Sequence, residues 1–97
     1  MTGKEKLNEL GARLREARIE RNEMQQMFAD RLGVSRPTLS RLEAGDPGVS
    51  IGVWVKVLQL LDRVDDLDHL LASRDDLFTQ YDRTTRPRRL RASRKRT

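Results

Sequence analysis

Gly33 stands between two short stretches of helical character, and this arrangement constrains the fold more than any other part of the sequence. The stretch before it repeats apolar residues at three- and four-residue steps, which predicts a helix over residues 25–32. The side chains expected to face the interior are Met24, Phe28, Ala29 and Leu32. Gly33 can adopt the positive φ that ends a helix at little steric cost, so a sharp turn is expected there.

Capping residues mark the helix that follows this turn. Ser35 can accept hydrogen bonds from the amides of a first turn, and Pro37 stands where a missing N–H costs nothing. We expect this helix to run from Arg36 to about Ala44, with Gly45 ending it. The turn between the two helices is therefore only three or four residues long and contains a glycine.

Helical patterns also flank this pair of helices. An apolar stripe predicts a first helix over residues 6–21, with Asn22 in the left-handed conformation at its end. After the pair, a tight turn over residues 46–48 leads to Ser50, which would cap an apolar helix over residues 51–61. The β-branched residues of that last run would also suit a buried strand, but its length and its cap favour a helix. Because the run is apolar on most sides, we expect it to be the central, buried helix.

The last helical pattern is short. Asp65 or Asp66 would cap a fifth helix that continues through Leu67, Leu70 and Leu71, after which the periodicity fades. The pattern over residues 1–71 therefore predicts an all-α fold of five helices.

Charge is distributed unevenly along the chain, whose net charge is +5. Residues 83–97 hold eight Arg or Lys and no acid, which leaves −3 on residues 1–82. The acidic side chains concentrate in residues 62–82, which have seven of them against two basic ones. The basic end has too little apolar content to fold alone, so we expect a disordered tail. Such a tail would attract phosphates nonspecifically or, alternatively, screen the acidic segment.

The residue types also exclude several classes of function. With no cysteine, the chain has no disulfide and no thiolate zinc site, and His69 is its single histidine. No metal, cofactor or enzymatic activity is therefore expected. No stretch reaches the roughly 18 consecutive apolar residues of a membrane span, so we expect a cytoplasmic protein associated with the nucleoid rather than with a membrane.

Two short helices joined by a glycine-containing turn, within a bundle of five, are typical of a helix-turn-helix that reads DNA rather than of an ordinary helical hairpin. Residues 24–45, MQQMFADRLGVSRPTLSRLEAG, resemble the lambda-repressor-like (XRE, Cro/CI) family. The residues that match the family's usual lead-in are Leu10, Gly11, Leu14, Arg15 and Arg18. The resemblance thus extends over about residues 7–71.

The resemblance implies that the third helix enters the major groove of DNA. The candidate DNA-binding residues are Gln25, Ser35, Arg36, Thr38, Ser40 and Arg41. Gln25 would anchor phosphate and register, and the serine and threonine hydroxyls suit phosphate or single base contacts. Arg36 or Arg41 could donate two hydrogen bonds to the O6 and N7 of a guanine, the alternative being ordinary solvated surface charges.

The resemblance also implies one structural pair and an assembly. The family's equivalent of Glu43 commonly pairs with an arginine of the first helix, for which Arg18 is the candidate. Since one recognition helix covers too few base pairs to be specific, we expect a homodimer on palindromic double-stranded operator DNA. The apolar residues expected at the dimer interface are Val64, Leu67, Leu70, Leu71, Leu77 and Phe78.

A narrower resemblance concerns the segments around the reading helices. Residues 45–52, the Asp-Asp-Leu helix and the arginine-rich end near residues 86–89 resemble HipB-type antitoxins, which are encoded beside HipA-like kinase toxins. This implies a repressor of its own operon that also holds a toxin, with the acidic segment or the basic tail as candidate contacts. The alternative is a stand-alone or phage-type repressor without a toxin partner.

The sequence is therefore expected to have three parts. Residues 1–71 form the helix-turn-helix DNA-binding domain, residues 72–82 an acidic connecting segment and candidate for dimerisation, and residues 83–97 the basic disordered tail.

Overall fold

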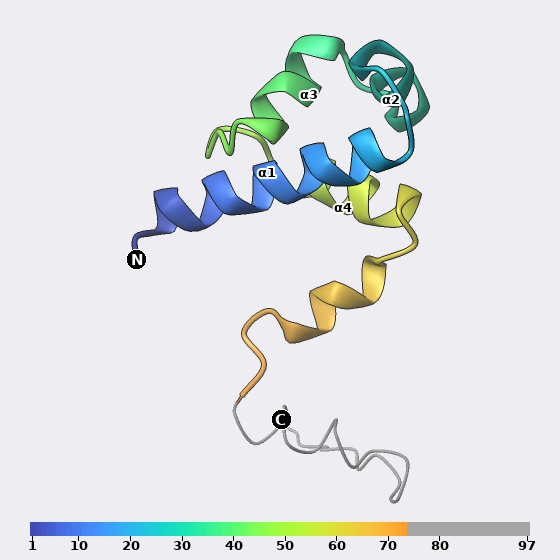
Figure 1. Cartoon of the computed structure of the whole chain (residues 1–97). Helices are drawn as coiled ribbons and strands as arrows, with labels where there is room; N and C mark the ends of the chain where they lie inside the picture. Colours follow the sequence, from blue (N-terminus) through green and yellow to red (C-terminus); the bar gives the residue numbers. More distant parts are fainter. Residues whose placement is uncertain (74–97) are drawn as a thin grey trace, which may run out of the picture. The chain divides into compact units, whose positions relative to one another are not determined.

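The computed structural model describes residues 1–73, which contain four α-helices, one 3-10 helix and no strand. The elements are α1 (Gly3–Glu20), α2 (Gln25–Leu32), α3 (Arg36–Glu43), α4 (Ile51–Leu60) and the 3-10 helix η1 (Val64–His69) (Figure 1). The all-α fold of five helices is confirmed for the described part of the chain. Residues 1–64 form one compact unit, and a second unit begins at Asp65.

Helix α1 begins earlier than its apolar stripe predicted. Thr2 and Glu5 form a capping box, in which the Thr2 hydroxyl accepts from the Glu5 amide (3.2 Å) and the Thr2 amide donates to the Glu5 carboxylate (2.8 Å). The prediction of a start at residue 6 was wrong because this cap precedes the first apolar residue. At the other end, Asn22 has a φ of 57°, as predicted.

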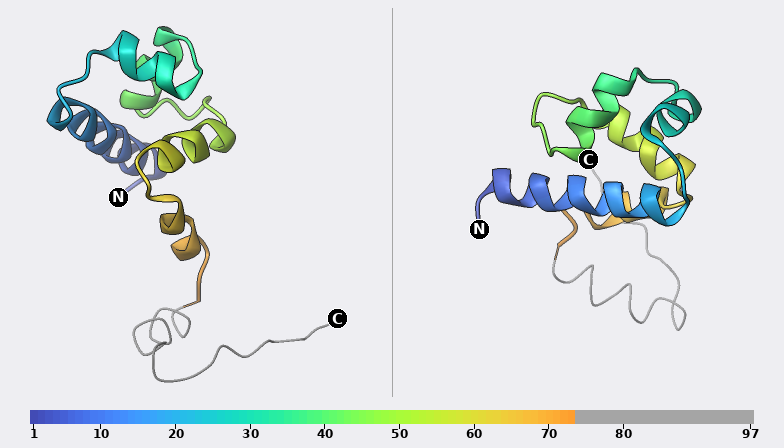
Figure 2. Two further views of the ribbon diagram at one scale, coloured as in Figure 1. Left: turned by 90° about the vertical axis from the view of Figure 1, so that its right-hand side faces the viewer. Right: turned by 45° about the horizontal axis from the view of Figure 1, so that its top comes forward.

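The turn between α2 and α3 follows from its local sequence. Gly33 has a φ of 78°, and its amide donates to the carbonyl of Ala29 at 2.9 Å. The Ser35 hydroxyl accepts from the Thr38 amide (3.2 Å), which caps α3. The two helices lie side by side in both views of Figure 2. The predicted bounds of α2, the cap of α3 and the left-handed glycine are all confirmed.

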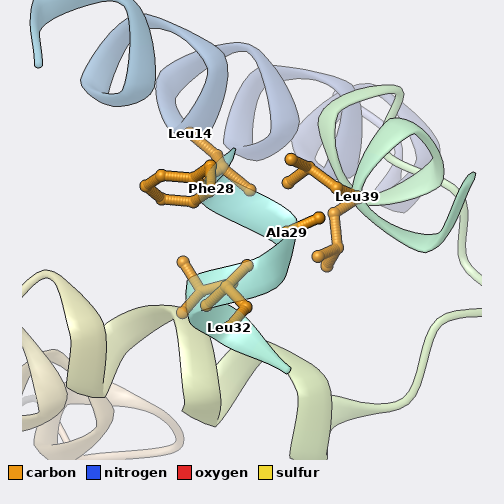
Figure 3. Close-up of a cluster of buried hydrophobic side chains, with 7 residues drawn as sticks. Leu14, Phe28, Ala29, Leu32 and Leu39 are labelled. Atoms are coloured by element: carbon orange, nitrogen blue, oxygen red, sulfur yellow. The ribbon is translucent and has the colours of Figure 1, made fainter. Parts of the chain in front are cut away.

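The hydrophobic core is built around α2. Its buried residues are Leu14, Phe28, Ala29, Leu32, Leu39, Leu42 and Val57 (Figure 3). Three of these belong to α2, two to α3, and one each to α1 and α4. Helix α2 contributes the largest share of these buried residues and is therefore the central element.

The prediction of α4 as the central, buried helix was wrong. Val57 is its one fully buried side chain, whereas Val53 and Trp54 are half-buried against the core and Ile51 is 63% exposed. The side of α4 with Val53, Trp54, Val57 and Leu60 packs against the core. The helix therefore has more apolar side chains than the described chain buries fully. Met24 was also wrongly expected inside: it is the N-cap of α2 and is 73% exposed.

The segment from Val64 differs from the prediction in helix type. It forms the 3-10 helix η1, with Asp65 and Asp66 in the first turn instead of at the cap, and none of its residues is buried. Leu71 follows with a φ of 59° and a fully exposed side chain. Leu77, Phe78 and the predicted boundaries at residues 82 and 83 lie outside the described residues.

Candidate nucleic-acid interface

The side of α3 that faces away from the core carries two arginines. Leu39 and Leu42 point into the core, whereas Arg36, Ser40 and Arg41 are exposed. An open depression on the surface brings these residues together with a proline and with one residue of α2. It is lined by Gln26, Arg36, Pro37, Ser40 and Arg41.

Three of the six candidate DNA-binding residues thus line one surface, and three do not. Ser35 caps α3, and the hydroxyl of the half-buried Thr38 lies 2.9 Å from the Ser35 hydroxyl. Gln25 is half-buried and does not line the depression. Sequence reasoning missed Gln26, for which the available signal was its place on the polar side of α2, four residues before Asp30.

A buried ion pair connects the ends of α1 and α3. The Arg18 guanidinium donates from Nε to Glu43 Oε2 (2.6 Å) and from Nη2 to Oε1 (3.1 Å). The two side chains are only 10% and 5% exposed. The hydrogen bond that Arg18 donates to Glu43 raises the pKa of Arg18 above its ordinary value, against the opposing effect of burial. The structure therefore brings together the two residues that the sequence named as a pair.

The same arginine also holds the turn between α1 and α2. Arg18 Nη1 donates to the backbone carbonyl of Glu23 at 2.8 Å. The Glu23 carboxylate in turn accepts from Arg31 Nη1 at 2.7 Å to each oxygen. This second pair was not predicted from the sequence, because Glu23 and Arg31 are eight residues apart and Glu23 lies outside α2. These contacts of Arg18 and Arg31 with Glu23 hold the turn between α1 and α2.

Gln25 links the buried pair to the exposed surface of α3. Its side-chain Nε2 donates to Glu43 Oε1 at 3.0 Å, and its Oε1 accepts from Arg36 Nε at 3.3 Å. Both heavy atoms of the amide are therefore engaged within the protein. This link engages Nε of Arg36, whose side chain is otherwise exposed.

Arg41 is held by different partners. Its Nε lies 4.0 Å from Asp46 Oδ2, and its Nη2 donates to Thr38 Oγ1 at 3.5 Å. Asp46 belongs to the loop after α3, where its Oδ1 accepts from the Gly48 amide at 2.7 Å. The two arginines of the depression thus have different partners. Arg36 contacts the neutral amide of Gln25, and Arg41 lies near the carboxylate of Asp46.

Within residues 1–73, no group of three or more His, Cys, Asp or Glu side chains is arranged to hold a metal ion. His69 is exposed on η1. None of the helices in this part of the chain has the length and apolar character that crossing a membrane requires.

The chain is similar to a known protein family. The model of the helix-turn-helix domain family matches residues 9–70, about two thirds of the chain. No curated protein matches the sequence, and no solved structure does. The matched range includes α2, the turn at Gly33 and α3, where the exposed arginines lie. The chain therefore belongs to the helix-turn-helix domain family, and this domain marks it as a DNA-binding regulator.

Proposed function

We propose that the protein is a sequence-specific transcriptional repressor that reads the major groove with α3. The observation that carries this proposal is the pair Arg36 and Arg41, exposed on one side of α3 beside Gln26 and Ser40. A guanidinium can donate two parallel hydrogen bonds to a guanine, which contributes about 1–3 kcal/mol of discrimination. A repressor follows if the bound site overlaps a promoter.

The supporting contacts have separate roles in this proposal. Ser40 contacts a phosphate or a single base edge, whereas Ser35 and Thr38 maintain the start of α3. Gln25 opens α2, whose N-cap Met24 makes no side-chain hydrogen bond. The first-turn amides of α2 are therefore available to a DNA phosphate, which sets the register of the protein on the duplex.

The repressor acts as a homodimer on a palindromic operator, with half-sites about 10 base pairs apart. Exposed apolar side chains near the end of the described chain support this assembly, since such groups favour contact with another surface. These residues are Val64, Leu70 and Leu71, with Leu67 half-buried beside them in the sequence. The acidic segment over residues 72–82 continues the interface, and the basic tail over residues 83–97 adds salt-dependent attraction to DNA.

The finer proposal is that the protein is the antitoxin of a HipA-like kinase module and represses its own operon. Its support is the sequence resemblance of residues 45–52 and of the arginine-rich end. A stand-alone or phage-type repressor is the alternative. Purification of the tagged protein from cells that carry its native gene neighbourhood separates them, because an antitoxin retains a stoichiometric kinase and a stand-alone repressor does not.

Selection of binding sites from a random duplex library tests DNA reading directly. The wild type is expected to enrich a palindrome with guanines at fixed positions. Arg36→Gln and Arg41→Gln should each lower the affinity for that palindrome about 5- to 100-fold and relax one base position per half-site. Arg15→Gln, which removes an exposed arginine of α1 outside the depression, is the control and should keep the preference. Failure of the wild type to enrich any sequence would overturn the proposal.

A further inference from the structure

We infer that Asp46 is a positioning residue for Arg41 and makes the domain prefer its own site over other DNA. The inference rests on the proposed function, because it assigns a role in the reading of one base. Asp46 lies three residues after the end of α3 and beside one of the two exposed arginines of that helix. Its effect is to hold Arg41 for base contact and to oppose contact of the same arginine with phosphates.

The carboxylate of Asp46 has a fixed position. Its own amide donates to the Arg41 carbonyl at 3.0 Å, and its carbonyl accepts from the Val49 amide at 3.3 Å. Its Oδ1 accepts from the Gly48 amide at 2.7 Å, which closes a side-chain turn of the kind that aspartate commonly forms. Three hydrogen bonds to the backbone therefore orient this residue, and Oδ2 remains for Arg41.

The contacts of Arg41 leave a defined edge of its guanidinium open. Nε faces Asp46 Oδ2 at 4.0 Å, and Nη2 reaches Thr38 Oγ1 at 3.5 Å, so the acceptors of the protein lie along the Nε side. The guanidinium has five N–H donors in a planar fork. The end formed by Nη1 and the second hydrogen of Nη2 is free, and this is an edge that can pair with the O6 and N7 of a guanine.

The charge of Asp46 adds a second effect. On its own site, Arg41 keeps its carboxylate partner while its free end contacts the base. On other DNA, an Arg41 that turns away from Asp46 toward a phosphate leaves the 38% exposed carboxylate unpaired near other phosphates. Unfavourable charge contacts of this kind weaken the wrong complex more than the right one. Arg36, held by the neutral Gln25, has no such carboxylate among its described partners and serves as an internal reference.

The variant Asp46→Asn separates the two roles of this side chain. The amide oxygen of asparagine can still accept from Gly48, so the loop is retained, whereas the negative charge is removed. Affinities are measured by fluorescence anisotropy for the duplex selected by the wild type and for a scrambled duplex of equal composition. The ratio of the two affinities is expected to fall about fivefold or more, with the affinity for the scrambled duplex rising. The lost base preference should lie at the position that Arg41→Gln also relaxes.

Two further variants make the test specific. Glu20→Gln removes an exposed carboxylate at the end of α1 and changes the net charge equally, so it should leave the affinity ratio unchanged. In an Arg41→Gln background, Asp46→Asn should have no further effect on base preference. An unchanged ratio, or equal losses on both duplexes with a lower melting temperature, would overturn the inference alone. A wild type that prefers no duplex overturns the proposed function, and the inference falls with it.

Discussion

Two carboxylates at and shortly after the end of α3, Glu43 and Asp46, each pair with an arginine but do so in contrasting surroundings. Glu43 is 5% exposed and contacts Arg18 at 2.6 Å, whereas Asp46 is 38% exposed and lies 4.0 Å from Arg41, which is itself 56% exposed. Water and salt compete with the exposed pair and hardly reach the buried one. Burial therefore decides how strongly such a pair affects the stability of the fold.

The two carboxylates also differ in how much of the fold depends on them. Glu43 joins the end of α1 to α3 through Arg18 and reaches the start of α2 through Gln25. Asp46 contacts the side chain of Arg41 and its own turn. We therefore expect substitutions near Glu43 to change the free energy of unfolding and those at Asp46 to change mainly the choice of DNA.

Glu43→Gln is expected to have the largest effect. It leaves the charge of Arg18 buried without a counter-charge, so the free energy of unfolding should fall by about 3–5 kcal/mol, measured by urea denaturation. The double variant Arg18→Met with Glu43→Leu replaces the whole pair by apolar groups and should recover most of that loss. A single variant as stable as the wild type would contradict the contrast drawn above.

Gly11→Ala tests the close approach of α1 to the end of α3 that places Arg18 beside Glu43. A Cβ on Gly11 would lie 2.5 Å from the Glu43 carbonyl oxygen and 2.6 Å from that of Leu42, both rigid backbone atoms. We expect a loss of about 1–3 kcal/mol in thermal denaturation despite the better helix propensity of alanine. Gly52→Ala in α4 is the matched control. Its Cβ would meet nothing closer than 3.6 Å, so a gain of up to about 1 kcal/mol is expected.

Variants of the neighbours Gln25 and Gln26 test whether Gln25 belongs to the buried network that Arg18 and Glu43 form. Gln25→Ala removes hydrogen bonds to Glu43 and Arg36 and should lower the free energy of unfolding by about 1–2 kcal/mol. Gln26→Ala removes one exposed hydrogen bond to Asp30 and should cost less than about 0.5 kcal/mol. Chemical denaturation of both variants checks the difference. Equal losses would mean that Gln25 is not part of the network in solution.

Asp46→Asn should have the smallest effect on stability. Because the Arg41 pair is exposed and its loop hydrogen bond can persist, the free energy of unfolding is expected to change by less than about 0.5 kcal/mol. The measurement is repeated at low and at high salt, where the difference from the wild type should shrink further. A loss comparable to that of Glu43→Gln would remove the distinction between the two carboxylates.

Local signals predicted much of the fold, and the errors arose where a local signal was weak or incomplete. Ser35, Gly33 and Ser50 each act on backbone groups within a few residues, and the limits of α2, α3 and α4 followed from them to within a residue. The start of α1 was missed because its capping box lies before the apolar stripe. The segment after Val64 has one weak apolar pattern, and its helix proved to be of the tighter 3-10 type.

Local signals likewise predicted one part of the candidate site, and the packing of the helices decided the other part. The sequence by itself determined that α3 starts after the Ser35 cap and carries arginines at positions 36 and 41, because a cap acts on the first turn of its own helix. Only the tertiary structure decided that α2 is central, that Val57 is the one fully buried side chain of α4, and that Gln25 bridges Glu43 and Arg36. It also decided that Asp46 lies at the side chain of Arg41. The physical reason is that caps and periodicity act over one or two turns, whereas burial and side-chain pairing depend on how the helices pack.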